Sequence, residues 1–396
     1  MGRGRDRRGQ LAAVAAELFH QRGYHDVGVN DIAAAAGITG PAVYRHFRSK
    51  QEILGHVVLA GVDRLIAAVH AALDASGSES APERLDVLLR ALAALSVERR
   101  ELGALWRREE RSLPTADRVE LVARLSQATR FGADLVKALR PELSTEDAVL
   151  LCSAALSVFG SISDHHTSLP KSRFERLLHS MAEAVIRSDA VILTETVPSI
   201  GPPHFSPVAE PPILPDHRRE QLLSVAARMF CERGFHDVTM EDIGSAAGIA
   251  GPSIYRHYDS KADLLLAMCN RVGEHLRSGL VSALGEGSPP AILKSLVESF
   301  VDAVFSHRNL MTAFLTEGRS LPERDRAEVR RALRGYIAEW VRIVVAAAPH
   351  LDEKEARIRV YAAFAVVSDL TRTSHFATRP HLPTELTALA TAALTP

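Results

Sequence analysis

Apolar residues recur along most of this chain at the spacing of an amphipathic helix. The first clear set is Leu11, Val14, Ala15, Leu18 and Phe19. The same spacing returns at Leu222, Val225, Ala226, Met229 and Phe230. This i, i+3, i+4, i+7, i+8 pattern predicts helices with one buried face. Since no segment alternates apolar and polar residues long enough for a strand, the pattern predicts an all-α chain.

Shorter elements follow each of these two helices. Gly23 and Gly234 are placed to end them, as glycine commonly does at a helix C-terminus. In the first copy, residues 29–37 then predict a short helix, and residues 41–47 predict a second one that begins at a proline. Two short helices joined by a glycine-containing turn predict a helix-turn-helix, whose second helix enters the DNA major groove.

The helix-turn-helix sequence occurs twice. "GITGPAVYRHFRSK" spans residues 37–50 and "GIAGPSIYRHYDSK" spans residues 248–261. Residues 15–54 match residues 226–265 at 22 of 40 positions without a gap. A later echo pairs "ERSLPTADR" (110–118) with "GRSLPERDR" (318–326). The repeated unit is about half the chain, which predicts a duplicated domain and not a short-period solenoid.

A proline-rich segment separates the two copies. Residues 191–215 contain seven prolines and favour an extended linker, in which about 20 residues reach roughly 60 Å at about 3.1 Å per residue. We therefore expect a first DNA-binding domain at residues 1–55 and a first ligand and dimerisation domain at 56–190. After the linker, we expect a second DNA-binding domain at 216–266 and a second ligand and dimerisation domain at 267–396. We call the two DNA-binding domains the first head and the second head.

Composition indicates the class of the protein and the cellular compartment in which it acts. The 396 residues are 46% hydrophobic, which is typical of globular domains, and the net charge of −1 argues neither for nor against nucleic acid. Three scattered cysteines fit a reducing cytoplasm better than a disulfide framework. No apolar run approaches 18 residues and the N-terminus lacks an apolar signal-peptide core, so we expect a cytoplasmic protein without a membrane span.

Motifs for catalysis or metal binding are missing from the sequence. It has no His-Glu-x-x-His, Cys-x-x-Cys or phosphate-loop motif, and the adjacent His165 and His166 would not share a helix face. We expect no catalytic residue, no metal and no cofactor. An enzyme and a pure scaffold stay open as alternatives, which an acyl-ester hydrolase assay and a DNA pull-down would address.

Both repeated segments resemble the helix-turn-helix of TetR-type transcriptional repressors. The resemblance implies two fused TetR-like domains, each with an N-terminal helix-turn-helix bundle and a C-terminal helical bundle for ligand binding and dimerisation. The double-length arrangement is similar to lipid-related tandem TetR-like repressors of actinobacteria. By this resemblance the partners are a double-stranded DNA operator and a small apolar inducer, which is lipid-like in such relatives.

The resemblance also assigns DNA-binding positions in this sequence. The base-facing residues would be Gly40, Pro41, Ala42, Tyr44 and His46, and in the second copy Gly251, Pro252, Ser253, Tyr255 and His257. The phosphate contacts would be Thr39, Tyr44, Lys50, Tyr255 and Lys261. The second copy has Ala250 in place of Thr39, which removes one cap and one phosphate contact. A purely core role for the tyrosine rings stays open.

The rest of each half would form the sensor. The resemblance places two dimerising helices near 145–166 and 172–190, and again near 353–376 and 383–395. The pocket candidates are Trp106, Phe159, Phe314, Tyr361 and Phe364, for which plain core packing is the alternative. We expect the two halves to pair with each other as a pseudo-dimer; the alternative is pairing between chains.

Charge differs between the two heads. Residues 1–50 hold eight Lys or Arg against four Asp or Glu, a net +4, whereas residues 212–261 hold six against seven, a net −1. Asn30 against Glu241 and Arg48 against Asp259 contribute, and so does a basic arm of Arg3, Arg5, Arg7 and Arg8. The first head should therefore bind phosphates more strongly than the second. A solvated tail is the alternative reading of the arm.

Overall fold

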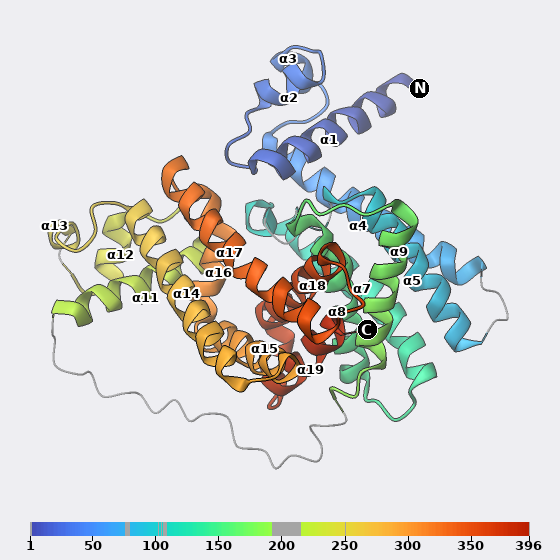
Figure 1. Ribbon diagram of the computed structural model, residues 1–396. Helices are drawn as coiled ribbons and strands as arrows, with labels where there is room; N and C mark the ends of the chain where they lie inside the picture. The colour runs from blue at the N-terminus through green and yellow to red at the C-terminus, as the bar shows by residue number, and fades with distance from the viewer. Residues whose placement is uncertain are drawn as a thin grey trace. The chain divides into compact units, whose positions relative to one another are not determined.

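The computed structural model describes residues 2–75, 80–101, 103, 105, 109–191, 215–249 and 251–395. They form two compact units: the first consists of the residues up to Ser188 together with the short segment Tyr361–Ala365, and the second of Asp189–Val360 and Val366–Thr395. Within the described residues every regular element is a helix (Figure 1). The prediction of an all-α fold is therefore confirmed.

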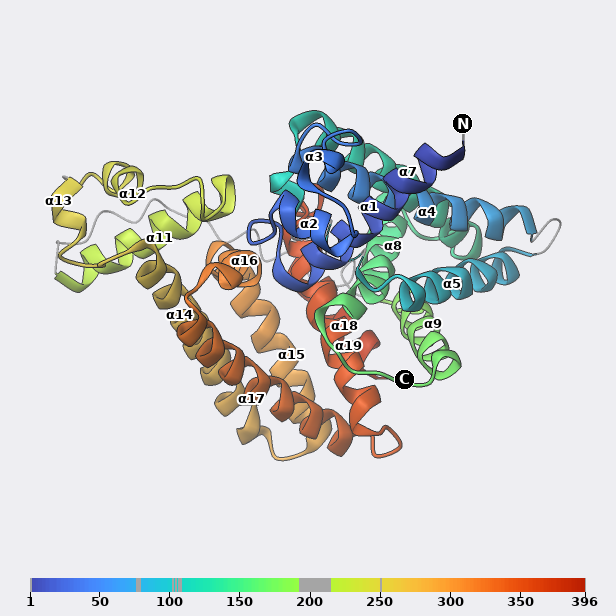
Figure 2. The same ribbon diagram turned by 90° about the horizontal axis from the view of Figure 1, so that it is seen from above.

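The first unit begins with three helices that make up most of the first head. These are α1 (Gly2–Arg22), α2 (Val29–Ala35) and α3 (Gly40–Val43). The long α4 (Lys50–Ala75) leads away from the head (Figure 2) and packs against α5 (Ala81–Glu98) and α7 (Thr115–Leu139). The short η1 (Glu110–Ser112) precedes α7, and α8 (Thr145–Gly160), η2 (Ser161–Asp164) and α9 (Lys171–Arg187) complete the unit.

The second unit repeats this order. Its head contains α11 (Pro215–Arg233), α12 (Met240–Ala246) and α13 (Gly251–Ile254), and α14 (Lys261–Ala283) leads away from it. The helices that follow are η3 (Leu284–Glu286), α15 (Pro289–Ser306), α16 (Arg308–Glu317), η4 (Gly318–Ser320) and α17 (Glu323–Ala347). The last are α18 (Glu353–Arg372), η5 (Ser374–Phe376) and α19 (Leu382–Leu394), so α8, α9, α18 and α19 lie where the sequence predicts dimerising helices.

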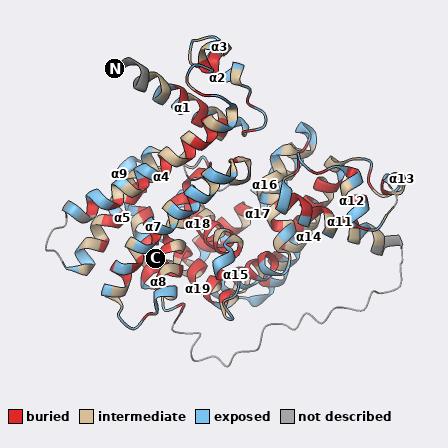
Figure 3. Ribbon diagram, turned by 180° about the vertical axis from the view of Figure 1, so that it is seen from behind, coloured by how far each residue is buried: buried red, intermediate tan, exposed pale blue. Residues whose placement is uncertain are grey.

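Each head has its own apolar core, as the buried stripe of α1 shows in Figure 3. Leu11, Ala15 and Phe19 are buried on α1, and the core continues through α4 to Leu121 of α7. The equivalent residues Leu222, Ala226 and Phe230 are buried in the second head. The predicted helix faces are thus confirmed in both copies.

Glycine ends the first helix of each head by adopting a left-handed backbone. Gly23 has φ 90° and Gly234 has φ 84°. A residue with a Cβ is strained in that region, whereas glycine is not. The chain can therefore leave each helix at once and run toward the helix-turn-helix.

The second helix of the first helix-turn-helix is shorter than the sequence predicts. We expected one helix over residues 41–47, but α3 ends at Val43. The His46 amide then donates to the Val43 carbonyl three residues earlier, and the Phe47 amide donates to the same carbonyl, four residues earlier. Tyr44 and His46 therefore lie in turns beyond the helix end. The predicted linker at residues 191–215 lies almost wholly outside the described residues.

Two helical stretches pass a test of length and composition for membrane spans. They are Lys50–Ala72 and Thr145–Asp164, and 50% and 67% of their most apolar windows are buried inside the protein. Our expectation of no such stretch considered only uninterrupted apolar runs. Burial at this level also occurs in the core helices of soluble proteins, so the test is weak evidence.

Candidate nucleic-acid interface

The helix-turn-helix of each head presents one exposed tyrosine. Tyr44 is 57% exposed and Tyr255 is 45% exposed. Both directly follow the second helix of the motif, which we call the recognition helix (α3 and α13). The exposed rings do not belong to the core, so the purely core alternative for them does not hold.

The inner side of the recognition helix fixes its position. Val43 and Phe47 are buried in the first head, and Ile254 and Tyr258 are buried in the second. The first turn of α3 approaches α2 closely, because a Cβ added at Gly40 would collide with the side-chain oxygen of Asn30. A larger residue at position 40 would require the Asn30 side chain to turn away from the recognition helix.

The remaining predicted positions are accessible in part. In the first head Thr39 and Pro41 are exposed, while Gly40, Ala42, His46 and Lys50 are half-buried. In the second head Ser253, His257 and Lys261 are half-buried. Gly251 and Pro252 open α13, but their side chains and Ala250 lie outside the described part. Thr39 occupies the N-cap of α3 without a side-chain capping hydrogen bond, contrary to the cap that we expected from it.

Lys50 holds the loop between α1 and α2. Its ammonium donates to the carbonyls of Tyr24 (2.9 Å) and Val27 (3.0 Å), and it lies 4.2 Å from the centre of the Tyr24 ring. The Tyr24 amide donates to Glu109 at 3.3 Å. Burial lowers the pKa of Lys50, while Glu109 and Asp26 act in the opposite direction. Burial and Glu109 also raise the pKa of Tyr24 to about 12.

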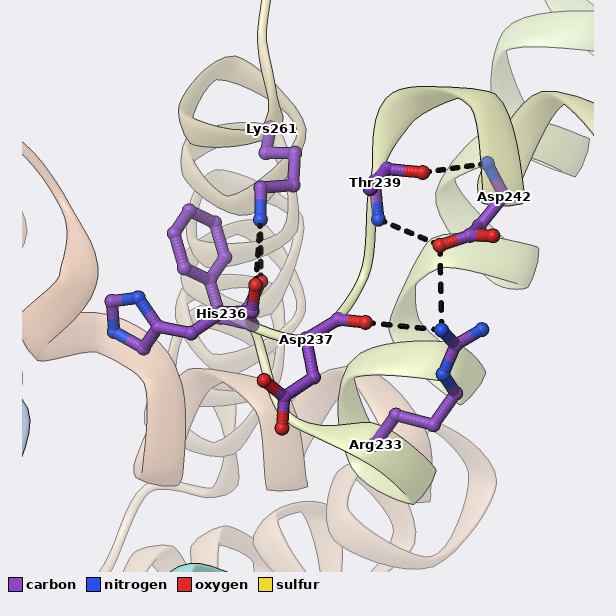
Figure 4. Close-up of polar contacts among 7 residues, drawn as sticks. Arg233, His236, Asp237, Thr239, Asp242 and Lys261 are labelled. Atoms are coloured by element: carbon purple, nitrogen blue, oxygen red, sulfur yellow. Dashed lines mark hydrogen bonds and ion pairs between the residues drawn. The ribbon is translucent and has the colours of Figure 1, made fainter.

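The second head repeats this arrangement with phenylalanine in place of tyrosine. The Lys261 ammonium donates to the Phe235 carbonyl at 2.8 Å and lies 4.7 Å from the ring centre (Figure 4). The Phe235 amide donates to Glu317 at 3.3 Å. In both heads the predicted phosphate-binding lysine therefore also organises a loop. Phosphate contact stays a prediction for Lys50 and Lys261.

An arginine near the start of each head stacks on a buried aromatic ring, which lies three residues after the exposed tyrosine. The Arg8 guanidinium lies 4.6 Å from the Phe47 ring centre and 3.0 Å from a Glu52 carboxylate oxygen. Arg219 lies 4.4 Å from the Tyr258 ring centre and donates to the His257 carbonyl. Sequence reasoning missed these contacts, although Arg8 and Arg219 are 211 residues apart, as are the repeated segments.

The basic arm is part of α1 in the described residues. Arg7 donates to the Ala36 carbonyl at the end of α2, and Arg8 binds within the head as above. These two side chains are tied to the helix-turn-helix and do not form a free tail. The side chains of Arg3 and Arg5 lie outside the description.

The first helix of the second motif has a complete capping box. The Thr239 hydroxyl accepts from the Asp242 amide, and the Asp242 carboxylate accepts from the Thr239 amide, both at 3.0 Å (Figure 4). Arg233 joins this carboxylate at 3.3 Å. In the first head Gly28 offers only its amide, which donates to Asp31 at 2.7 Å. The two heads therefore differ at the start of this helix.

A cavity of about 40 Å³ lies inside the first unit, between α4, α5 and α8. Its walls are mainly apolar and include Leu65, Leu92, Leu156, Phe159 and Ile162, with Arg99 and Ser96 as polar members. Phe159, one of the pocket candidates, is therefore part of a cavity wall. Arg99 is paired with Glu101 at 2.6 Å, so its charge is balanced.

The other pocket candidates lie elsewhere. Phe314 packs against the core of the second head, in agreement with the core-packing alternative. Tyr361 and Phe364 are half-buried residues of α18 and are not among the residues that line this cavity. Trp106 lies outside the described residues.

Comparison with known proteins identifies the repeated segments. The family described as "Bacterial regulatory proteins, tetR family" matches residues 11–57 and again 222–268. A second family, "Tetracyclin repressor-like, C-terminal domain", matches residues 286–373. Both heads, and much of the helical region after the second one, are covered by these matches.

Two curated relatives are regulators of transcription and not enzymes. The activator FasR of Mycolicibacterium smegmatis is 46% identical over 90 residues, which are 22% of this chain and 41% of FasR. The repressor KstR2 of Rhodococcus jostii is 32% identical over 117 residues, 28% of this chain and 54% of KstR2. The chain thus matches about two-fifths to a half of the length of these relatives.

Solved structures of bacterial regulators are also similar to this chain. The TetR family regulator PfmR from Thermus thermophilus is 24% identical, with a TM-score of 0.40 over 45% of this chain and 97% of PfmR. The duplicated match to the DNA-binding domain, with the C-terminal domain beside its second copy, identifies the protein as a tandem member of the TetR family of bacterial regulatory proteins.

Proposed function

We propose that the protein is a ligand-responsive, DNA-binding transcriptional repressor that acts in the cytoplasm. Its heads read the two half-sites of one operator, and a small apolar, lipid-like inducer releases it. The observation that carries this proposal is the duplicated helix-turn-helix with an exposed tyrosine beside each recognition helix. In such motifs the recognition helix lies in the major groove and side chains near its start reach base edges.

The proposed base-contacting residues are those at the recognition helices. They are Gly40, Pro41, Ala42, Tyr44 and His46, with Gly251, Pro252, Ser253, Tyr255 and His257 in the second head. Thr39, Lys50 and Lys261 are proposed to bind phosphates. Ser253 offers a hydroxyl where Ala42 offers only a methyl group, so the two half-sites should be similar but not identical.

The domain layout proposed from the sequence fits this function. Heads at residues 1–55 and 216–266 would each be followed by a sensor, at 56–190 and 267–396, with the linker at 191–215. The cavity beside Phe159 supports an apolar inducer, because its walls offer few hydrogen-bond partners. At about 40 Å³ it would have to widen to take a lipid chain, and that widening would shift α4, which leads to the head.

We further propose that the two halves pair with each other as a pseudo-dimer. Residues 148–162 of α8 and η2 carry no charged side chain, and neither do residues 360–368 of α18. Helices that are apolar on all sides need cover on more than one face. Pairing of the last helices of the two halves would supply that cover and place two heads in one molecule.

The test is selection of DNA from a randomised library by the full chain, followed by titration of the selected duplex. Double substitution of Tyr44 and Tyr255 to alanine is expected to weaken binding at least tenfold, because both rings are exposed beside the recognition helices. The matched control replaces Tyr336 of α17, which is not in a head, with phenylalanine. Selection that returns no enriched sequence would contradict the proposal.

A further inference from the structure

One contact on the helix-turn-helix of the second head has no counterpart in the first. Tyr255 donates its hydroxyl to the Glu241 carboxylate at 3.1 Å. Both side chains are exposed, Glu241 in the first turn of α12 and Tyr255 just after α13. The hydrogen bond to the carboxylate raises the pKa of Tyr255. The hydroxyl is therefore engaged as a donor within the protein.

The first head has an uncharged residue in the position of Glu241. Asn30 precedes Glu241 by 211 residues, and Tyr44 precedes Tyr255 by the same number. The Asn30 side chain reaches the first turn of the recognition helix, as its approach to Gly40 shows. A side chain at this position of the motif thus borders the surface that carries the predicted base contacts. In the second head that side chain is a carboxylate.

Within the part of the chain that the structure describes, the Glu241 carboxylate has no ion-pair partner. Among the described side chains, no lysine, arginine or histidine lies within ion-pair distance of it. Arg233, the basic group at the same end of α12, is paired with Asp242 instead. Five residues after α13, the exposed Asp259 stands where the first head has Arg48. The second head thus carries carboxylates at two positions where the first head has an amide, Asn30, and a guanidinium, Arg48.

A carboxylate that has no cation partner changes what a DNA-binding surface can bind. It repels phosphate oxygens, and it accepts hydrogen bonds without donating any. On a base edge in the major groove it can accept from an amino group, such as N4 of cytosine. Since Tyr255 already donates to Glu241, its hydroxyl is also less available to a phosphate.

We propose that Glu241 is the specificity-determining residue of the second head: its carboxylate suppresses sequence-independent phosphate binding and directs this head to base-edge donors. The inference rests on the proposed DNA-binding function. It assigns the two heads different tasks. The first head supplies binding to phosphates, and the second adds little affinity for DNA of the wrong sequence.

The test compares charge-neutralising variants of the full chain. E241Q keeps the size of the side chain and an oxygen that accepts from Tyr255, but it removes the charge. We expect E241Q to bind a random-sequence duplex about fivefold more tightly, the effect of one unit charge on neighbouring phosphates across water. Its affinity should also fall more steeply with salt. N30E in the first head should weaken the same binding by a similar factor.

E286Q provides the matched control. Glu286 lies in η3 beyond the far end of α14, roughly 33 Å along that helix from Lys261, and its neutralisation should leave binding unchanged. If wild type binds neither a random nor a selected duplex, the proposed function is wrong. If wild type binds but E241Q behaves like E286Q, or if N30E has no effect, the assignment of Glu241 is overturned.

Discussion

At the scale of single residues, cations hold the loops and helix ends of each head in place. Lys50 and Lys261 bind loop carbonyls and an aromatic face, and Arg8 and Arg219 stack on a second aromatic ring. A cation over a ring contributes about 0.5–1 kcal/mol at partly exposed sites, and each charged hydrogen bond adds about as much or more. The helix-turn-helix is thus held at both ends before any ligand arrives.

Replacement of Lys50 by methionine should loosen the loop that it holds. K50M keeps the apolar stem but removes both hydrogen bonds, and we expect a loss of about 1–3 kcal/mol of local stability. Hydrogen exchange of peptides that cover residues 23–28 measures it. K50R, which keeps the charge and the donors, should lose less. Equal exchange in wild type and K50M would show that the loop does not depend on Lys50.

His165 is the residue whose protonation should affect stability most directly. It is 6% exposed, and its Nδ1 accepts from the Thr167 amide at 3.1 Å. Arg100 donates to the His165 carbonyl at 2.7 Å. Burial, and then the charge of Arg100, lower the pKa of His165 to about 4. The folded protein therefore holds this ring neutral at pH values where the unfolded chain protonates it.

The stability that depends on neutral His165 should be present above pH 6.5 and lost as the pH falls toward 4. In that window the unfolded chain binds the proton and the folded chain does not, so acidification favours unfolding. At about pH 5 the loss is about 2 kcal/mol. In H165N an amide oxygen replaces Nδ1, so its Tm should fall less between about pH 7 and pH 5 than that of wild type. Equal decreases in Tm for wild type and H165N would exclude His165 as the cause of the loss of stability in acid.

At the scale of elements, one glycine decides how closely two helical segments cross. Gly103 adopts a helical conformation against the end of α8. A Cβ at this position would lie 2.9 Å from the Gly160 carbonyl oxygen and 3.1 Å from its Cα. These are backbone atoms, which cannot move aside cheaply. Gly103 also lines the apolar cavity, so this crossing forms part of its wall.

The two glycines at positions 103 and 273 should respond to alanine with opposite signs. Alanine normally stabilises a helix interior relative to glycine by about 1 kcal/mol. Gly273, inside α14, has open space around the added methyl group, so G273A should raise the Tm. G103A should lower it, at a cost of about 1–3 kcal/mol for overpacking. Thermal unfolding of both variants gives the answer, and stabilisation by G103A would contradict the packing described here.

The sequence predicted the elements better than the contacts between them. Periodicity and glycine positions located α1 and α2, because burial of one helix face leaves a repeating pattern, and the family resemblance located the last helices of each half. The end of the recognition helix at Val43 was missed, since a short helix and a helix followed by turns share the same residue spacing. The carbonyl partners of Lys50 lie 23 and 26 residues away in the chain, and no local pattern encodes them.

At the scale of the whole molecule, one chain holds two units, each with its own DNA-binding head. If the halves pair as proposed, the protein should run in light scattering at the mass of one chain, 43.0 kDa. One chain should then saturate one duplex with two half-sites. A mass near twice this value, with each half packed on a neighbouring chain in a crystal structure, would show four-headed assembly instead.

Each head is held together by contacts within itself, and this independence affects how the protein can evolve. Arg8, Phe47, Tyr24 and Lys50 make their ring contacts within the first head, and Arg219, Tyr258, Phe235 and Lys261 do so within the second. The tyrosine also differs in position. In the first head the ring beside the lysine is a tyrosine, Tyr24, whereas in the second head the ring beside the arginine is a tyrosine, Tyr258. In a homodimer every mutation appears in both subunits at once. Here a mutation changes one head and leaves the other unchanged, so the two heads can diverge independently under selection.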